Sequence, residues 1–400
     1  MRDAFLFWLF FSLMLLVKNK FNNQIKSSSS QSDEGFTIMQ TEIQSMKELM
    51  QSKWNKRPLI ISGPCSAETE EQVIETATRL AKTGKVDVLR AGIWKPRTKP
   101  GLFEGIGTKG LPWLAQAKKV TGMPITVEVA TAKHVQDALQ FDIDMLWVGA
   151  RTTVNPFSVQ EVADALRGVD IPVLIKNPIN PDLELWSGGI ERLQKVGIKQ
   201  VGMIHRGFSS YGNTEYRNAP MWHLPIEMKR RFPGMPLICD PSHICGNRTS
   251  LQYVAQKSIN LHFDGLMLET HIDPDNAWSD AKQQITPERL HEMLDAIAWR
   301  HENTDEKEFL TALAKLREQI NHLDDELMTI LGQRMKVADK IGEYKKNNNI
   351  TILQTNRWNE ILEKAFDKGD KLGLSKEFVT KYYDAIHLES INHQNKVMNS

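Results

Sequence analysis

The chain has 400 residues, 41% of them hydrophobic and 25% charged, a composition that excludes a disordered or fibrous protein. Its 50 Lys and Arg residues nearly balance 49 Asp and Glu residues, so the net charge of +1 gives no long-range field for holding nucleic acid or an acidic membrane. Any anion must therefore be held by cations placed locally. Three cysteines, Cys65, Cys239 and Cys245, are too few for a disulfide framework and predict a reducing, cytoplasmic location.

The first 37 residues do not have the pattern of a folded segment. A nearly unbroken apolar run covers residues 5–17, and a polar stretch with four consecutive serines follows at 22–35. The run is too short to span a bilayer, and no small-x-small cleavage pattern follows it. We interpret residues 1–37 as an extension outside the fold and expect no membrane partner. The alternative is a membrane-tethered protein in which this run is an anchor.

Residues 58–300 alternate between short β-branched runs and helical stretches. The expected strands are 58–63, 88–93, 124–129, 145–149, 172–176, 200–205, 236–239 and 265–269. Each run is followed by a helical segment, the last of them at 286–300. Eight βα units over about 240 residues predict a (β/α)8 barrel, within a domain that we place at 38–300. A doubly wound α/β sheet is the structural alternative.

In such a barrel the chemistry lies at the carboxyl ends of the strands, and here those ends carry polar residues. Each of these polar residues by itself is explained as a solvated charge in a loop or as a buried polar group whose hydrogen bonds are satisfied. Together at one rim they are too costly to bury unless they pair with one another, a metal or charged ligands. Cys65, His243, Glu269 and Asp280 form a mixed donor set that suits a divalent transition metal. A ligand with several negative charges is predicted by six cations, Arg90, Lys95, Arg97, Arg151, Lys176 and Arg206.

These segments resemble the 3-deoxy-D-arabino-heptulosonate 7-phosphate (DAHP) synthases of type Iβ. The matching segments are Gly63-Pro64-Cys65-Ser66, residues 90–98, Gly149-Ala150-Arg151, Asp240-Pro241-Ser242-His243, Glu269-Thr270-His271 and Ala277-Trp278-Ser279-Asp280. The resemblance implies the condensation of phosphoenolpyruvate with erythrose 4-phosphate, which opens the shikimate pathway. It also implies that Cys65, His243, Glu269 and Asp280 bind manganese or a similar divalent ion such as cobalt, iron or zinc.

The same resemblance assigns the substrate contacts. Phosphoenolpyruvate would be held by Arg90, Lys95, Arg151, Lys176 and Arg206, and erythrose 4-phosphate would meet Arg97 and Thr98. The related 3-deoxy-octulosonate 8-phosphate synthases use a five-carbon sugar phosphate, but the Lys-Pro-Arg-Thr loop at 95–98 favours the four-carbon one. Lys95 is our candidate for proton transfer to the aldehyde oxygen, and Glu128 for positioning the attacking water. Whether Asp240, His205 and His271 take part or only orient their neighbours stays open.

After a polar joint at 301–305, a second domain is expected at 306–400. Apolar residues recur at three- and four-residue steps from Phe309 to Ile330, and no helix breaker precedes 347–349. This pattern predicts a helix of about 40 residues, roughly 60 Å long, and therefore a partner chain to cover it. Arg334 and Lys345 lie on one face, whereas Arg317 is on the order of 40 Å from Lys345 and could join them only from the other chain of an intertwined dimer.

These positions, together with Arg357, Ser390 and Gln394 on two later helices, resemble the all-helical chorismate mutases, which are three-helix intertwined dimers. The resemblance implies rearrangement of chorismate to prephenate. Arg317, Arg334 and Arg357 would bind the two carboxylates with help from Ser390, while Lys345 and Gln394 would meet the ether oxygen. The chain departs from the family at Gln354 and Trp358, where acids are common.

Two interpretations of the second domain remain open. Spacing alone is also satisfied by a helical dimerisation arm, and the departures at Gln354 and Trp358 support a catalytically silent sensor of ligand beside a working barrel. The fusion itself predicts control. We expect chorismate or prephenate in the helical domain to lower the activity of the barrel.

Overall fold

The computed structural model describes residues 58–96, 101, 103–212, 215–301 and 303–400. They form two compact units, of which the second begins at Asn303. The expected N-terminal extension, residues 1–37, lies outside the described residues. In the described part of the chain, no helix is both long and apolar enough to cross a membrane.

The first unit is a closed barrel of eight parallel strands that neighbour one another in chain order. The strands are β1 (Leu59–Gly63), β2 (Val88–Ala91), β3 (Ile125–Val129), β4 (Met145–Val148), β5 (Val173–Lys176), β6 (Val201–His205), β7 (Leu237–Cys239) and β8 (Gly265–Glu269). The barrel closes where β1 pairs with β8, with Gly63 opposite Glu269. The predicted barrel is confirmed, and each strand boundary lies within one or two residues of its predicted place.

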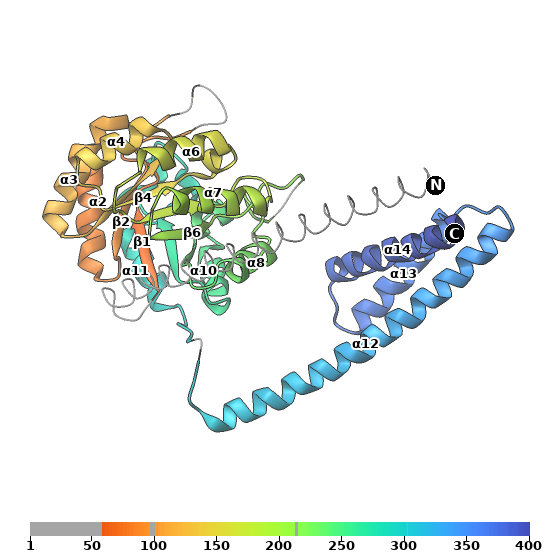
Figure 1. The fold of residues 1–400 in the computed structure, drawn as a ribbon. Helices are drawn as coiled ribbons and strands as arrows, with labels where there is room; N and C mark the ends of the chain where they lie inside the picture. Colours follow the sequence, from red (N-terminus) through yellow and green to blue (C-terminus); the bar gives the residue numbers. More distant parts are fainter. Residues whose placement is uncertain (1–57, 97–100, 102, 213–214, 302) are drawn as a thin grey trace, which may run out of the picture. The chain divides into compact units, whose positions relative to one another are not determined.

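Helices surround this barrel (Figure 1). The long ones are α2 (Glu70–Thr83), α3 (Gly110–Thr121), α4 (Ala132–Gln140), α6 (Pro156–Ala165), α7 (Leu183–Lys195), α8 (His223–Arg231), α10 (Leu251–Asn260) and α11 (Pro287–Asp295). Side chains cap several of them, as where the Thr69 hydroxyl accepts the Gln72 N–H at the start of α2. The last helix ends at Asp295 and not at residue 300, because the Gln256 side chain binds both backbone groups of Ala298 and turns the chain against α10.

Two short helices escape the sequence pattern because one helical turn has no measurable period. They are α5 (Ala150–Thr153), directly after β4, and α9 (Pro241–Cys245), directly after β7. The Asp240 side chain caps α9 by accepting the His243 N–H at 3.1 Å. Single 3-10 turns at Gly107–Lys109, Pro274–Asn276 and Ala281–Gln283 complete the loops.

Strand residues alternate between an outer core under the helices and an inner core inside the barrel. The inner core consists of Leu59, Ile61, Val88, Met145, Trp147, Leu174, Ile204, Ile238 and Met267. Continuing the same alternation to the strand ends gives the inward parity to Arg90, Glu128, Lys176, Arg206, Asp240 and Glu269. The polar residues that the sequence places at the carboxyl rim therefore point toward one site.

The second unit has three helices, α12 (Lys307–Asn347), α13 (Thr355–Lys371) and α14 (Lys376–Asn399). Helix α14 packs along α12 and α13 (Figure 1). Gly342 permits a close approach of α12 to α14, since a Cβ there would lie 3.0 Å from the Gln394 Cα. The 41-residue α12 confirms the long predicted helix. Its first half leaves an apolar stripe exposed, at Leu316, Ile320, Leu323 and Leu327.

Candidate active sites

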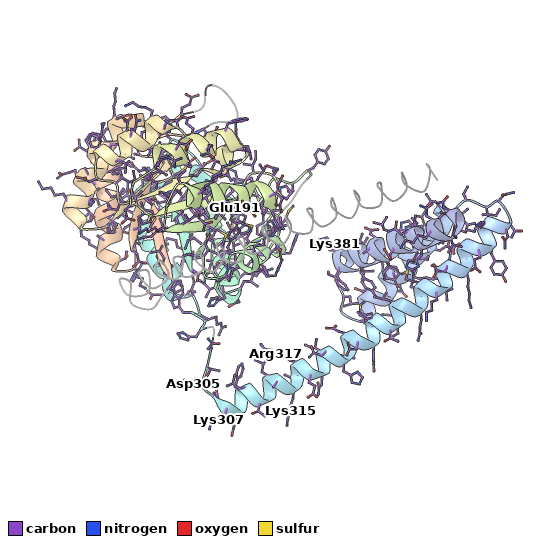
Figure 2. All side chains as sticks on the ribbon, viewed as in Figure 1. Glu191, Asp305, Lys307, Lys315, Arg317 and Lys381 are labelled. Atoms are coloured by element: carbon purple, nitrogen blue, oxygen red, sulfur yellow. The ribbon has the colours of Figure 1, made fainter. Side chains whose placement is uncertain are left out.

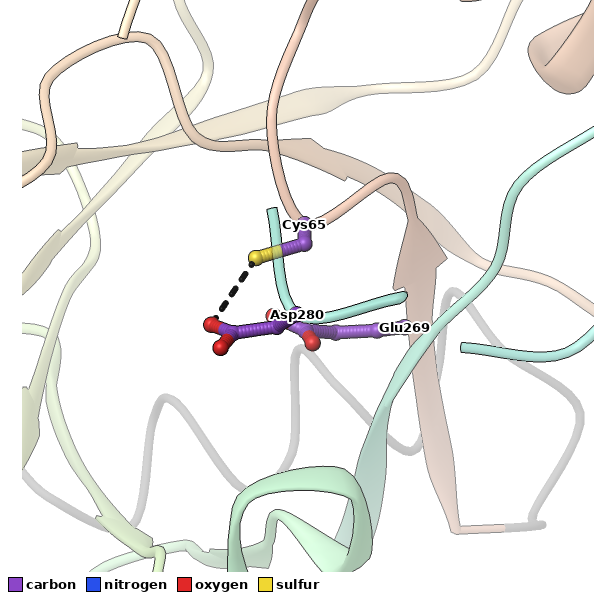
Figure 3. A group of neighbouring side chains, drawn as sticks. All are labelled: Cys65, Glu269 and Asp280. Atoms are coloured by element: carbon purple, nitrogen blue, oxygen red, sulfur yellow. Dashed lines mark hydrogen bonds between the residues drawn. The ribbon is translucent and has the colours of Figure 1, made fainter. Parts of the chain in front are cut away.

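Three of the four expected metal ligands lie together at the carboxyl rim of the barrel (Figure 3). Cys65 follows β1, Glu269 ends β8, and Asp280 precedes the turn at Ala281–Gln283. Their ligand atoms all lie within 4.8 Å of one another. The Cys65 thiol donates to Asp280 Oδ2 at 3.4 Å. A sulfur ligand and two carboxylates at this spacing fit a divalent transition metal.

The fourth expected ligand, His243, flanks this group. Its Nε2 lies 3.8 Å from Glu269 Oε1, and its Nδ1 lies 2.8 Å from Asp240 Oδ2. Since the Asp240 carboxylate can only accept, the proton belongs on Nδ1, and Nε2 is left facing Glu269 as a potential ligand. A carboxylate behind a histidine is the usual way of orienting a metal-binding imidazole. Asp240 thus orients its neighbours.

The charges of this cluster depend on the surrounding cations. Burial raises the pKa of Cys65 to about 12, so without an ion it is a neutral thiol. Burial would also raise the pKa of Glu269, but His243 and Arg90 outweigh it and lower that pKa. Arg217 and His243 likewise lower the pKa of Asp280 against the effect of burial. The buried Glu269 carboxylate and the half-buried Asp280 carboxylate therefore stay ionised side by side, which suits a cation.

Four of the expected phosphoenolpyruvate residues lie beside this cluster, and the fifth, Arg151 of α5, is exposed near Arg206. Arg90 is buried, with Nη1 at 3.2 Å from Glu269 Oε1, and its Nε has no hydrogen-bond partner among the described residues. Lys176 Nζ lies 2.7 Å from Asp240 Oδ2, and Lys95 Nζ donates to Cys65 Sγ at 2.9 Å. Burial, together with nearby Arg217 and Arg151, lowers the pKa of Arg206 to about 10 despite Asp240. Cations this crowded favour binding of an anion.

The floor of this cation group is an aromatic side chain that sequence analysis missed. Trp147 is fully buried, with the Arg90 guanidinium 5.0 Å and Lys176 Nζ 5.9 Å from its ring centre. Its indole N–H donates to Glu128 Oε2 at 3.1 Å. Gly149 leaves room for this carboxylate, because a Cβ there would lie 2.0 Å from Glu128 Oε1. In the sequence Trp147 is indistinguishable from any apolar residue of a buried strand. The one sequence feature that could have placed it inside the barrel is the alternation of inward and outward strand residues.

Two loop residues that sequence analysis also missed hold the potential metal ligands Asp280 and Glu269 in place. Arg217 donates to Asp280 Oδ1 at 3.0 Å and to Gln283 Oε1 at 2.7 Å, and Gln283 donates to Glu269 Oε2 at 2.6 Å. Arg217 lies in the loop before α8, where no periodic pattern marks a residue for function. No sequence signal would have found it.

His271 and His205, whose roles the sequence left open, have different surroundings. His271 Nδ1 accepts the Asp273 N–H at 2.9 Å, so Nε2 carries the proton and faces Glu68 Oε2 at 3.2 Å. Glu68 in turn accepts the Trp278 N–H at 2.7 Å, close to Asp280. His205 has the outward parity and lies among Trp186, Phe208, Trp222 and Phe263. Burial lowers the pKa of His205 to about 3, which makes it a neutral core residue.

The expected erythrose 4-phosphate contacts, Arg97 and Thr98, lie outside the described residues.

The helical unit contains a cavity of about 280 Å³ between its three helices. Its lining includes all but one of the expected mutase residues, namely Arg334, Lys345, Arg357, Ser390 and Gln394. Arg334 Nη1 donates to the Ser390 hydroxyl, and Lys345 Nζ donates to the Ile352 carbonyl at 2.5 Å. Gln394 Nε2 donates to the Ser390 carbonyl at 3.3 Å, while its buried Oε1 has no partner among the described residues.

Arg317 is the expected residue that does not line this cavity. It lies on the first half of α12, before the part of that helix that runs along α13 and α14 (Figure 2). Gln354 and Trp358, where the sequence departs from the mutase pattern, do line the cavity. Glu360 does not substitute for the missing acids, because it accepts a hydrogen bond from Arg357 at 2.8 Å and is absent from the lining.

Comparison with known proteins covers both units. Residues 41–306 match the DAHP synthetase I family, and residues 316–395 match chorismate mutase type II. A phospho-2-dehydro-3-deoxyheptonate aldolase of Thermotoga maritima is 31% identical over 59% of this chain and 67% of its own. A 2-dehydro-3-deoxyphosphooctonate aldolase of Vesicomyosocius okutanii is 26% identical over 60% of this chain and 92% of its own.

Solved structures give the same result for the DAHP synthase part of the chain. The crystal structure of the Thermotoga maritima DAHP synthase aligns with a TM-score of 0.54 and 29% identity, over 60% of this chain and 68% of that one. A truncated form of the enzyme from the same organism aligns at 0.52 and 27%, over 60% and 85%. The two matched regions support both a DAHP synthase and a chorismate mutase activity. The chain belongs to the DAHP synthetase I family and has a chorismate mutase type II domain fused behind its barrel.

Proposed function

We propose that the barrel rim binds phosphoenolpyruvate over Trp147 and erythrose 4-phosphate beside the Cys65, Glu269 and Asp280 group. The observation that supports this most is the convergence of buried Arg90, Lys176 and Arg206 beside the three potential metal ligands. Arg90, Lys95, Arg151, Lys176 and Arg206 neutralise phosphoenolpyruvate, which lets its C3 approach a second phosphorylated molecule. Arg97 and Thr98 contact the sugar phosphate.

The residues around these substrates supply protons and water in our proposal. Cys65, His243, Glu269 and Asp280 would hold a divalent ion, manganese by preference, which would polarise the aldehyde carbonyl of erythrose 4-phosphate. Lys95, held at 2.9 Å from Cys65 Sγ, gives a proton to the aldehyde oxygen as C3 of phosphoenolpyruvate bonds to the aldehyde carbon. Glu128, fixed by Trp147, positions the water that adds at C2 before the C–O bond to phosphate breaks.

The barrel proposal is tested by following phosphoenolpyruvate loss with erythrose 4-phosphate and Mn²⁺. We expect turnover by the intact chain and a loss of at least a hundredfold for Lys95→Ala, as for other removed proton donors. Lys133, exposed on α4, gives a matched control in Lys133→Ala. Undiminished turnover by Lys95→Ala would contradict the proposed proton transfer.

The helical cavity is, in our proposal, the site where chorismate rearranges. Arg334, Arg357 and Ser390 bind the carboxylates, and Lys345 and Gln394 face the ether oxygen, on which negative charge develops in the transition state. The convergence of these five side chains on one cavity carries the proposal. Disappearance of chorismate is the assay, and an inactive domain that still binds chorismate would favour the silent sensor instead.

We further propose that two chains form an intertwined dimer through α12. Its exposed apolar stripe needs a cover, and Arg317 of one chain would complete the cavity of the other. Mixing Arg317→Ala and Arg334→Ala chains tests this, since each variant alone lacks an arginine in both sites. Random re-pairing of the two variants should restore about a quarter of the wild-type mutase sites. No recovery after verified exchange of subunits would refute a shared site.

Ligand in the helical cavity also lowers barrel activity in our proposal, as expected for the first enzyme of a route whose later metabolites bind the same chain. The test is phosphoenolpyruvate consumption with and without saturating prephenate, in the wild type and in Lys345→Ala. Inhibition that Lys345→Ala relieves would support control through the cavity. Unchanged barrel kinetics in the wild type would exclude it.

A cytoplasmic location completes the proposal. Cys65, Cys239 and Cys245 are all buried and form no disulfide, which suits a reducing compartment and a sulfur ligand. Fractionation of cells that express the full chain tests this location.

A further inference from the structure

The described lining of the helical cavity has cationic side chains but no acidic ones. Three cations line it, Arg334, Lys345 and Arg357, and no Asp or Glu occurs among the described residues of its lining. Glu360, outside the lining, pairs with Arg357. A ligand with two carboxylates therefore meets two cations, Arg334 and Lys345, for which no acid competes among the described residues. The one lining group that titrates near neutral pH is His387 of α14.

His387 stacks on Trp358 of α13, with ring centres 4.0 Å apart and planes 11° from parallel. The stack covers one face of the imidazole and fixes its plane within the cavity lining. An indole face stabilises a cation placed over it, so this contact tolerates a protonated ring as well as a neutral one. Trp358 occupies a position where the sequence departs from the mutase pattern, and the structure shows that it has a specific partner there.

Burial and a neighbouring arginine favour the neutral form of His387 when the cavity holds no ligand. Burial lowers its pKa, and Arg334 of α12 lowers it further, while Asp384, one turn earlier on α14, raises it. Arg357 is the charged cavity residue of α13. A bound dicarboxylate would offset the repulsion from the arginines and add a negative neighbour. Protonation of the ring then becomes favourable in the complex.

We propose that His387 is a further ligand-binding residue of the mutase cavity and takes up a proton when the dicarboxylate binds, with Trp358 supporting its ring. This inference rests on the proposed function of the cavity. Because the bound state holds more protons than the free state, affinity rises as pH falls from about 8.5 to about 6.5. Burial also lowers the pKa of Lys345, and any loss of its charge with rising pH weakens binding in the wild type and in His387→Gln alike.

Calorimetric titration of the full-length protein with prephenate tests the proposal. Runs at pH 7 in two buffers of different ionisation enthalpy give the number of protons taken up per site. We expect a fractional uptake by the wild type and close to none by His387→Gln, which retains an N–H donor but cannot be charged. His387→Gln should bind about three- to tenfold more weakly at pH 6.5 and within about twofold of the wild type at pH 8.5.

Two further variants test whether the proton uptake is specific to His387 and whether prephenate binds in this cavity. His322→Gln removes an exposed histidine of α12 outside the cavity lining and should leave the proton uptake unchanged. Equal uptake by the wild type and His387→Gln would overturn the proposal, as would no uptake by the wild type. Lys345→Ala tests the cavity itself, because full prephenate affinity in that variant would show that the ligand binds elsewhere and the mutase site is misplaced.

Discussion

The barrel rim and the helical cavity both gather cations, but they balance the positive charge differently. At the rim two central cations face a buried acid, Arg90 with Glu269 and Lys176 with Asp240. In the cavity, Arg334 is held by the Ser390 hydroxyl and Lys345 by a backbone carbonyl. The rim is therefore assembled from one chain before any ligand arrives. In the cavity, Arg334 and Lys345 keep their charge for the ligand, Arg357 pairs with Glu360 outside the lining, and Arg317 is absent from the lining.

This difference follows from how each fold is completed. The eight strands of the barrel close on themselves, so the ends of β1 and β8 bring Cys65 and Glu269 together without help from outside. The helical unit exposes the first half of α12, and its pocket uses only the second half. The barrel site should consequently tolerate damage to assembly, and the helical site should not.

The largest effect is expected from removing the sulfur ligand. Since burial keeps the Cys65 thiol neutral in the absence of an ion, Cys65→Ala changes no charge balance and should preserve the fold. Loss of a ligand should weaken binding of Mn²⁺ and lower DAHP synthase turnover on the order of a thousandfold, with mutase turnover intact. Both rates and the Mn²⁺ dissociation constant are measured, and the buried Cys245 supplies the matched control Cys245→Ala. Wild-type affinity for Mn²⁺ in Cys65→Ala would remove this residue from the metal site.

Lys345→Ala should have the opposite effect, a loss of mutase turnover with DAHP synthase turnover intact. This lysine faces the cavity, and removal of a cation from developing negative charge costs on the order of a hundred- to a thousandfold in turnover. Its neighbour Lys346 is exposed and bonds the Val397 carbonyl at 3.4 Å, so Lys346→Ala is the control. Chorismate loss is the measurement, with barrel activity in the absence of prephenate unchanged in both variants. Similar losses of mutase turnover in the two variants would show that the overall positive charge of this region matters, and not the position of Lys345 in the cavity.

The sequence predicts the frame of both regions better than their details. Alternation of β-branched runs fixes eight strands and their order, and continued parity explains why Arg90, Glu128 and Glu269 converge. Trp147 was missed because an aromatic residue in a buried strand is expected in any core. Arg217 was missed because its contact with Asp280 depends on two loops whose paths have no periodic signal. Helical spacing pairs Arg334 with Lys345 and Ser390 with Gln394, and the resemblance to chorismate mutases joins them with Arg357 into one site. The stack of His387 on Trp358 joins separate helices and needs the fold.

A smaller effect should show how the rim is preorganised. Trp147→Phe keeps an aromatic face for Arg90 and Lys176 but removes the N–H that fixes Glu128. We expect kcat of the DAHP synthase to fall about three- to tenfold, the scale of one lost hydrogen bond, with little change in KM for phosphoenolpyruvate. Trp147→Leu also removes the face and should raise that KM. Equal KM values for the two variants would deny the ring a part in holding the cations.

The smallest effect concerns the close approach of α12 to α14, on which the cavity depends. In a helix interior Gly→Ala is worth about 1 kcal/mol in favour of the helix, and Gly332→Ala should gain this because nothing lies within 4 Å of the added Cβ. Gly342→Ala meets the Gln394 Cα at 3.0 Å, and overpacking of this kind costs about 1–3 kcal/mol.

The gain and the cost for Gly342→Ala sum to between no change and a loss of about 2 kcal/mol, so its melting temperature should fall less than overpacking alone would give. Mutase turnover should nevertheless fall about threefold to tenfold, because a backbone shift of α14 at Gln394 moves a group that must face the ether oxygen. Chorismate loss and the melting temperature are compared across both glycine variants. A fall in turnover without a matching fall in stability separates positioning from folding, and the barrel rate, measured in the same samples, should not respond to either substitution.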